Sequence, residues 1–224
     1  MDSILLIDKP KGITSAKAVA LVKKRFNTKV GHTGTLDPLA TGLLILLTGK
    51  RTKQAATFLH MDKSYQVRAI LGFSTTTYDI AGDVVKTCDR LVAREEMEEN
   101  LQGFTGELLQ VPPAFSAKKI GGKKAYELAR QGLPVDIPAS KVTVYSLRLV
   151  SFDYPNFTLE CEVSSGFYVR SLVHDLGEKI GVGATVEEVR RIRVGAYHIE
   201  NAVTLDELLG EPVASGPVAA PAQE

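Results

Sequence analysis

Apolar and polar residues alternate along two stretches of this chain, residues 64–73 and 158–164. In the first stretch every second residue is apolar, at Tyr65, Val67, Ala69 and Leu71. The second stretch repeats the pattern at Leu159, Cys161 and Val163. Successive side chains of a strand point to opposite faces, so the alternation predicts strands with one buried and one solvated face. Such strands are typical of antiparallel sheets, and the apolar N-terminal residues predict another early strand.

Helices are predicted between these strands, with Thr14 and Ser15 capping one that runs to about Phe26. The other predicted helices cover residues 94–102, 123–131 and 171–180. Two capping-box pairs predict late helices: Thr185 with Glu188, and Thr204 with Glu207. Strands and helices are interspersed without a strict βαβ rhythm. The predicted class is therefore α+β, with a mixed, largely antiparallel central sheet flanked by helices.

The composition is typical of a globular protein in water. Of the 224 residues, 44% are hydrophobic and 24% are charged. No apolar run approaches the roughly 20 residues of a membrane span, and the N-terminus lacks the basic region and cleavage site of a secretory signal. Two cysteines, Cys88 and Cys161, cannot form a disulfide framework. We therefore expect a cytoplasmic location and no membrane association.

Basic residues are clustered, although the net charge is only +1. The clusters lie at residues 23–25, 50–53, 118–124 and 190–193. Runs of this kind often form only solvated helix faces. If several of them share one face, they form a phosphate-binding surface, and both interpretations stay open from the sequence.

The sequence motifs exclude several common chemistries. The Gly49-Lys50 pair lacks the earlier glycine and the following Ser or Thr of a P-loop. The four histidines lack the paired spacing of a zinc site, and no nucleophile elbow or dinucleotide fingerprint occurs. We therefore expect no metal and no organic cofactor. His174 and Asp175 are neighbours on a predicted helix, where a solvent-facing position is favoured.

The most distinctive segment is a loop with the sequence GHTGTLDPLATG at residues 31–42. It holds His32 and Asp37 five residues apart, beside glycine backbone that a substrate can approach closely. Asp37 before Pro38 is also a common helix start, and a helix over residues 38–47 would place the helix dipole at the carboxylate. A nucleophilic carboxylate at Asp37 is compatible both with a position in a glycine-rich loop and with a position at the start of a helix.

Arg170 stands at a predicted junction between a strand and a helix, after the aromatic residues Phe167 and Tyr168. An arginine buried there needs a carboxylate partner, because burying an unpaired charge is costly. Tyr65 and Tyr168 are compatible with core positions as well as with a binding site.

Six sequence blocks follow one another along the chain. They are DKPKGITS at residues 8–15, GHTGTLDPLATG at 31–42, DKSY at 62–65, QVPPAFSAKK at 110–119, GFYVRS at 166–171 and DLGEK at 175–179. Together they resemble the TruB family of tRNA pseudouridine synthases, over about residues 3–208. The resemblance implies the pseudouridine synthase fold and a bacterial-type enzyme that isomerises the uridine at position 55 in the T-loop of tRNA, by base flipping.

The resemblance also implies roles for the catalytic residues. Asp37 falls on the catalytic aspartate of the family, and Arg170 on the arginine that pairs with this carboxylate. Tyr65 matches the tyrosine that stacks on the target base and has been proposed as the general base. No cofactor is implied, because the isomerisation gains no atom and no redox equivalent.

Further residues match positions that hold the substrate or the loops. His32 falls on the histidine that enters the RNA loop, and Tyr168 and Val189 fall on positions that line the uracil pocket. Lys9 and Pro10 belong to a motif that supports the active-site loops. The segment 119–141 corresponds to a flexible insertion that closes over the T-arm of the tRNA.

The expected organisation is one catalytic domain over residues 1–210 and a disordered tail over residues 211–224. Many members of the family continue into a C-terminal RNA-binding domain of the PUA type, so we expect a short form with a weaker grip outside the T-arm. The expected partner is tRNA, bound by a monomer without an obligatory protein partner. Two alternatives are a tRNA-binding or folding chaperone on the same fold and a guide-dependent pseudouridine synthase that acts on rRNA.

Overall fold

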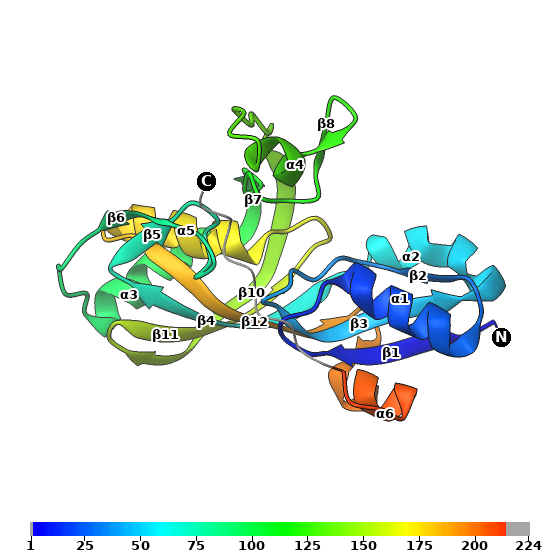
Figure 1. Ribbon diagram of the computed structural model, residues 1–224. Helices are drawn as coiled ribbons and strands as arrows, with labels where there is room; N and C mark the ends of the chain where they lie inside the picture. The colour runs from blue at the N-terminus through cyan, green and yellow to red at the C-terminus, as the bar shows by residue number, and fades with distance from the viewer. Residues whose placement is uncertain (1, 214–224) are drawn as a thin grey trace. The chain divides into compact units, whose positions relative to one another are not determined.

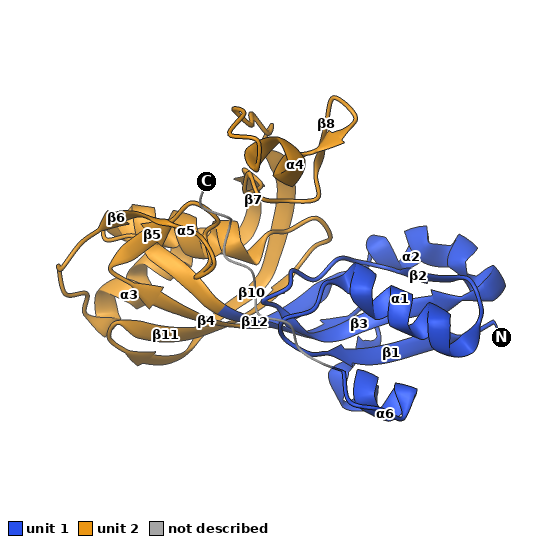
Figure 2. Ribbon diagram, in the orientation of Figure 1, with its two compact units in different colours: residues 1–66, 188–218 blue, residues 67–187, 219–224 orange. Residues whose placement is uncertain are grey.

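The computed structural model describes residues 2–213, which divide into two compact units (Figure 2). The first unit comprises residues 2–66 and 188–213, and the second comprises residues 67–187. Two strands, β4 (Lys63–Leu71) and β12 (Ala184–Val194), contribute residues to both units. The tail expected at residues 211–224 lies, from residue 214 on, outside the described residues.

The first unit is built on a mixed sheet. Strand β1 (Ile4–Lys9) pairs antiparallel with β3 (Thr41–Thr48), in a register that places Ile4 opposite Leu47 and Lys9 opposite Gly42. The short β14 (Val203–Thr204) lies parallel to β1, and β2 (Val30–His32) lies antiparallel to β3. On the other side of β3 the end of β12 runs parallel to it, and β13 (Tyr197–His198) pairs antiparallel with β12.

The buried strand β3 supplies side chains to two apolar clusters, one for each of its faces. Leu44 and Leu46 pack in a cluster with residues of β1, α1 (Ser15–Phe26) and α6 (Leu205–Leu209). Leu43, Ile45 and Leu47 pack in the other, with residues of α2 (Ala55–Leu59) and β12. In Figure 1, α1 and α6 flank the β1 and β3 strands of this unit. The 3₁₀ helices η1 (Gly49–Gln54) and η3 (Ile199–Asn201) complete it.

The alternative of a helix over residues 38–47 is therefore wrong. A continuous apolar run has the same appearance in a buried helix and in a strand covered on both faces, so the pattern does not separate them. Here both faces of the segment are covered, and the side chains alternate with the period of a strand. Asp37 consequently lies in a loop before a strand and does not begin a helix.

The second unit is mainly antiparallel. Its long strand β10 (Ser140–Asp153) pairs with β11 (Asn156–Val163) and β7 (Gly106–Gln110), and the sheet order is β4-β11-β10-β7. Two small hairpins, β5 (Phe73–Thr75) with β6 (Val84–Thr87) and β8 (Lys119–Ile120) with β9 (Lys123–Lys124), form separate sheets. Its helices are α3 (Arg94–Leu101), η2 (Gln102–Phe104), α4 (Ala125–Ala129) and α5 (Val169–Ile180).

Most of the predicted elements are confirmed, and so is the α+β class. The Thr14 side chain accepts a hydrogen bond from the Lys17 amide at the start of α1, and Thr204 with Glu207 forms the predicted capping box of α6. The helix predicted to begin at Thr185 is wrong, because these residues lie in β12. The helix predicted over residues 123–131 is confined to α4, since Lys123 and Lys124 pair in β9.

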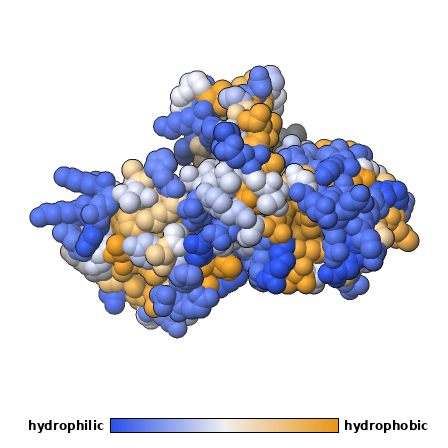
Figure 3. All heavy atoms as spheres, turned by 180° about the vertical axis from the view of Figure 1, so that it is seen from behind, coloured by the Kyte–Doolittle hydropathy of each residue, from blue (hydrophilic) through white to orange (hydrophobic). Residues whose placement is uncertain are grey.

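Some large apolar side chains lie outside the apolar core, at the surface. Leu91, Leu109 and Val85 are exposed. Figure 3 shows the molecule from behind, with apolar patches among hydrophilic residues on that face. Scattered exposure of this kind is normal for a globular protein.

Helix α5 packs closely against the start of β12 at Gly177. A Cβ atom at Gly177 would lie 2.1 Å from the Ala184 amide nitrogen and 2.4 Å from the Gly183 carbonyl carbon. Both neighbours are backbone atoms, so a side chain at this position could be accommodated only if the chain moved. The carbonyl of Gly177 also accepts hydrogen bonds from the three amides of residues 181–183.

We predict that Gly177→Ala destabilises the protein by about 3 kcal/mol, the upper range for overpacking. Gly181→Ala is the matched control, because Gly181 has a φ of 91° but open space around its Cβ position. Its expected cost is only about 1 kcal/mol, from the left-handed backbone. Urea unfolding followed by circular dichroism measures both. Equal costs for the two variants would contradict the close approach at Gly177.

Candidate active site

The loop that carries Asp37 is fixed by hydrogen bonds to its backbone on both sides of that residue. The Ser15 hydroxyl, at the start of α1, contacts both the amide and the carbonyl of Leu36, each at 2.9 Å. The Pro38 carbonyl accepts a hydrogen bond from the Gly12 amide at 2.9 Å. Asp37 is half-buried between these two anchored residues. The position of its carboxylate is thus set by its neighbours.

Lys9 supports the same loop from the inside. The side chain is completely buried, and its ammonium donates to the carbonyls of Ile13 at 2.7 Å, Pro10 at 2.8 Å and Pro38 at 3.5 Å. Burial lowers the pKa of Lys9 to about 8, an effect that the negative charge of Asp37 opposes. The supporting role expected for the Lys9-Pro10 motif therefore has a physical basis in these contacts.

Arg191 of β12 is a second buried cation at this loop. Its exposed fraction is 2%. Its guanidinium donates to the Leu43 carbonyl at 2.8 Å and to the Gly34 carbonyl at 3.1 Å, one on each side of Asp37 in the sequence. The backbones of Gly42 and Arg191 also lie in contact, since a Cβ atom at Gly42 would lie 2.3 Å from the Arg191 carbonyl oxygen. The φ of Gly42 is 98°. The sequence indicated only a basic cluster here.

The other members of that basic cluster are also engaged within the first unit. Arg190 forms two hydrogen bonds to the Asp8 carboxylate, at 2.6 and 3.1 Å. Arg193 donates to the Ser64 hydroxyl at 3.0 Å and to the Gly195 carbonyl at 2.9 Å. Neither a solvated face nor a phosphate-binding surface therefore describes Arg191, which is buried, and Arg190 and Arg193 both have partners within the unit.

The remaining predicted residues of the first unit lie on or beside its sheet. Tyr65, on β4, is only 8% exposed, and His32, on β2, is half-buried. Val189, on β12, packs partly buried against the cluster that includes Leu44. Lys9, Pro10, His32, Asp37, Tyr65 and Val189 all belong to the first unit, whereas Tyr168 and Arg170 belong to the second.

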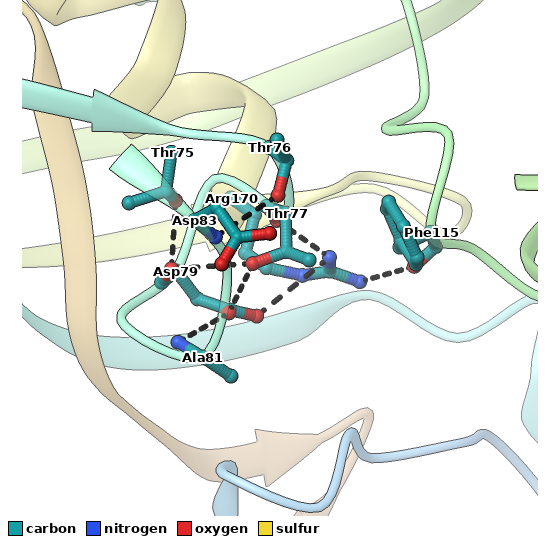
Figure 4. Close-up of polar contacts among 8 residues, drawn as sticks. All are labelled: Thr75, Thr76, Thr77, Asp79, Ala81, Asp83, Phe115 and Arg170. Carbon is teal, nitrogen blue, oxygen red and sulfur yellow. Dashed lines mark hydrogen bonds and ion pairs between the residues drawn. The ribbon is translucent and has the colours of Figure 1, made fainter. Parts of the chain in front are cut away.

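In the second unit, Arg170 is held in the first turn of α5 by backbone carbonyls. Its side chain donates to the carbonyls of Thr77 and Phe115, both at 2.9 Å (Figure 4). A carboxylate oxygen of Asp79 lies 3.8 Å from the guanidinium. Arg170 and Asp79 are both buried, with exposed fractions of 7%. The carboxylate partner expected for a buried arginine is therefore present, at a residue that the sequence did not single out.

Asp79 is itself fixed within the turn of residues 75–81. Its carboxylate accepts hydrogen bonds from the Thr77 hydroxyl at 2.6 Å and from the Ala81 amide at 3.1 Å. Its carbonyl accepts from the Thr75 hydroxyl at 2.7 Å. Figure 4 shows these threonines gathered around the Asp79 side chain. A Thr-rich turn gives no specific signal in a sequence, so only the structure identifies Asp79.

Tyr168 is anchored just before α5 by a side-chain amide. Gln110 accepts a hydrogen bond from the Tyr168 amide at 2.8 Å and donates one to its carbonyl at 3.0 Å. Three residues after Tyr168, the Ser171 hydroxyl donates to the Val111 carbonyl at 2.7 Å. The end of β7 thus fixes the entry to the helix that carries Arg170.

The solvent-facing position favoured for the His174–Asp175 pair is correct for Asp175, whereas His174 is half-buried. Its imidazole stacks on the ring of Tyr78, with centroids 3.7 Å apart and planes inclined by 7°. Burial lowers the pKa of His174. Its neighbour Asp175 is exposed, and desolvation together with Glu178 raises the Asp175 pKa to about 6. Adjacent residues of a helix point in different directions, so His174 and Asp175 differ in their exposure to solvent.

Within residues 2–213, no three or more His, Cys, Asp and Glu side chains gather as metal ligands would. No described helix is both long and apolar enough to span a membrane.

Chains of two solved RNA–protein or protein complexes share this fold. A chain of a Cbf5–Nop10–Gar1 complex superposes with a TM-score of 0.72 and 29% identity, covering 92% of this chain and 53% of that one. A chain of an H/ACA ribonucleoprotein bound to a substrate RNA containing 2′-deoxyuridine gives a TM-score of 0.69 with 28% identity, over 92% and 52%. This chain thus spans about half the length of these structural relatives.

The family follows from sequence models and curated relatives. The N-terminal domain model of the TruB pseudouridylate synthases matches residues 22–169, and the C-terminal domain model of tRNA pseudouridylate synthase B matches residues 170–214. The chain is 49% identical to tRNA pseudouridine synthase B of Aquifex aeolicus, over 93% of this chain and 74% of that protein. It is 42% identical to that of Chlamydia trachomatis serovar L2, over 95% and 88%. The chain belongs to the TruB family of pseudouridine synthases.

A further buried cation makes the stability of the first unit dependent on pH. Lys63 is 8% exposed and donates to the carbonyls of Leu59 and Met61. Burial and the charge of Arg191 lower its pKa from 10.5 to about 8, while Asp62 opposes the effect. The folded state therefore releases this proton at a lower pH than the unfolded state does.

We predict that this group adds stability as the pH rises from about 8 to 10.5, because the unfolded chain binds more protons over that range. The full effect corresponds to about 3 kcal/mol at most. Urea unfolding of the wild type and of Lys63→Met at pH 7.5 and 9.5 measures it. The wild type should gain stability relative to the variant. Lys53→Met, at an exposed lysine, is the control and should follow the wild type. A constant difference between Lys63→Met and wild type would contradict the assignment.

Proposed function

We propose that this protein isomerises uridine to pseudouridine at position 55 in the T-loop of tRNA, with Asp37 as the catalytic carboxylate. The observation that carries the proposal is the loop around Asp37, in which the carbonyls of Leu36, Pro38 and Gly34 each accept a hydrogen bond from a buried side chain. The names of the curated relatives, tRNA pseudouridine synthase B, support the substrate class. The two family models together cover residues 22–214, which supports the assignment along most of the chain.

The reaction explains why a positioned carboxylate is sufficient. The N1–C1′ bond of the nucleotide breaks, the uracil rotates, and C5 bonds to C1′, so no atom or redox equivalent is gained. The sugar carbon becomes electrophilic, or its 2′ proton acidic, as the base departs, and either change calls for a carboxylate. A rigid loop removes the cost of ordering that carboxylate during the reaction.

In this proposal Arg170 accompanies the carboxylate of Asp37. Its guanidinium is oriented by two carbonyls and by Asp79, and a buried, oriented cation is an effective partner for a carboxylate in a water-poor site. Tyr65 supplies a stacking face for the target base and a phenolic oxygen near its C5. A tyrosine that is mostly buried presents its ring in a defined orientation.

The remaining residues would hold the flipped nucleotide. His32 enters the RNA loop, and Tyr168 and Val189 line the uracil pocket. Flipping a base out of its stack costs a few kcal/mol, which contacts of this kind offset. Lys9 and Pro10 act on the loop backbone and do not touch the substrate in this scheme.

The insertion at residues 119–141 is proposed to bind the T-arm backbone. Lys124 and Arg130 both lie over the ring of Tyr126, each 5.4 Å from its centroid. The lysines of the β8–β9 hairpin are exposed, and Lys141 lies at the other end of the insertion. Basic residues on a surface hairpin suit phosphate contacts, which position RNA without reading its sequence.

The two alternatives give different expectations. A chaperone that only binds tRNA has no need of the fixed loop around Asp37. A guide-dependent enzyme is favoured only by the Cbf5 and H/ACA structures, which are 29% and 28% identical, whereas the tRNA pseudouridine synthases B cited above are 49% and 42% identical. The stand-alone tRNA enzyme is therefore the better supported function.

The direct test uses an unmodified T-arm hairpin. We predict that the protein modifies one loop uridine and that Asp37→Asn forms no detectable pseudouridine, because the amide cannot act as a carboxylate. Carbodiimide labelling followed by primer extension maps the product, and filter binding measures affinity for the hairpin. Asp153→Asn, at an exposed aspartate of β10, is the matched control and should modify the hairpin normally.

The affinity of Asp37→Asn for the hairpin should stay within about threefold of wild type, because the carboxylate contributes to the reaction and not to RNA binding. Unchanged turnover by Asp37→Asn would remove Asp37 from the catalytic role. Tight binding without product from the wild-type protein would favour the chaperone.

A further inference from the structure

The face of α5 that carries Arg170 also carries His174, one helical turn later. Residues four apart on a helix lie on the same side. Three consecutive residues of the 75–81 turn contact this pair: the Thr77 carbonyl and the Asp79 carboxylate meet Arg170, and the Tyr78 ring stacks on His174. The turn is thus joined to α5 at two points, one polar and one aromatic.

Tyr78 holds an unfavourable backbone conformation to make this contact. Its φ is 63°, in the left-handed region that a tyrosine rarely adopts. Among the described residues other than glycine, only Asn27 shares a positive φ, and asparagine tolerates it at a helix end. The Tyr78 amide donates to the Thr75 carbonyl at 3.2 Å, and its carbonyl accepts from the Val186 amide at 3.1 Å. Residues in such a conformation persist where the surrounding structure holds them, and the Tyr78 ring is held by its stack on His174.

Tyr78 and His174 contact each other through the flat faces of their rings. The Nδ1 atom of His174 is buried and has no hydrogen-bond partner among the described residues, so the imidazole is not held by a polar contact at that atom. Burial lowers the pKa of His174, and burial with the charges of Asp175 and Glu178 raises that of Tyr78. Two uncharged rings in parallel contact pack well with little cost of desolvation.

We propose that Tyr78 and His174 are positioning residues, whose stack holds the 75–81 turn against α5 and thereby fixes the Thr77 and Asp79 groups that orient Arg170. The inference rests on the proposed function, because it acts through the role of Arg170 in the reaction. Neither ring is assigned a contact with the substrate. The ion pair to Asp79 is already long at 3.8 Å, so a small displacement of the turn would loosen it.

The sharpest variant is Tyr78→Gly, because glycine accepts a φ of 63° without strain while removing the ring. Relief of the backbone strain offsets part of the lost packing, so folding is preserved while the stack is lost. We expect kcat on the T-arm hairpin to fall about tenfold, as for a slightly misplaced catalytic group, with KM within twofold of wild type. Tyr78→Phe keeps the ring and should keep at least half of the wild-type kcat.

The partner ring gives a matched pair of variants. His174→Ala removes one face of the stack and should also lower kcat about tenfold, whereas His174→Phe restores a flat ring and should rescue it. The double variant Tyr78→Gly/His174→Ala should be no slower than either single variant, because both remove the same contact. A hundredfold loss in the double variant would show two independent effects and overturn the proposal.

Amide hydrogen exchange provides a readout that does not depend on turnover. The amides of Ile80 and Ala81 donate to the Val186 carbonyl and to the Asp79 carboxylate. Both should exchange faster in His174→Ala and recover in His174→Phe, although the substitution lies on another element. Unchanged exchange in His174→Ala would overturn the proposal, even if the wild type proved inactive on the hairpin.

The remaining outcomes separate this inference from the proposed function. Full kcat in Tyr78→Gly alongside an inactive Asp37→Asn would refute the positioning role and leave the function standing. A loss explained wholly by a lower folded fraction, with kcat per folded molecule unchanged, would likewise refute it. An inactive wild-type protein whose exchange responds as predicted would refute the function while supporting the contact between the turn and α5.

Discussion

The loop that carries Asp37 depends on two buried cations, which donate hydrogen bonds to its backbone carbonyls. Lys9 and Arg191 have several donors each, and they supply hydrogen bonds to Pro38 and Gly34 in this loop and to Ile13 and Leu43 beside it. Burying a cation is costly, and the lowered pKa of Lys9 reflects that cost. The cost is compatible with a stable fold because each cation replaces several backbone contacts that would otherwise be missing.

The second unit uses the same principle at Arg170. A buried guanidinium is oriented by two carbonyls and one carboxylate, and the carboxylate is oriented in turn by a threonine hydroxyl and a backbone amide. Rigid support of this kind is what a catalytic arrangement requires, because reacting groups must be held in place before the substrate arrives. In both units, contacts with buried side chains hold the proposed functional groups in place.

Membership of the TruB family makes these arrangements interpretable, and the structure adds residues that the recognisable motifs leave out. Arg191, Asp79, Tyr78 and His174 carry no motif that the sequence analysis could use. Arg191 resembled part of a surface basic cluster, and Asp79 and Tyr78 lie in a turn of common polar residues. Their importance arises from burial and from contacts with residues far away in the chain.

Local signals in the sequence determined the elements whose stability is local. Alternation identified β4 and β11, the Thr14 cap located α1, and the Thr204–Glu207 box located α6, because hydrogen bonds within a few residues fix each of these. Family motifs pointed to Asp37, Arg170 and Tyr65. Only the tertiary structure decided that residues 41–48 form a strand and that residues 185–188 lie in β12. It also decided which cations are buried, because strand pairing and burial depend on distant partners that no local pattern contains.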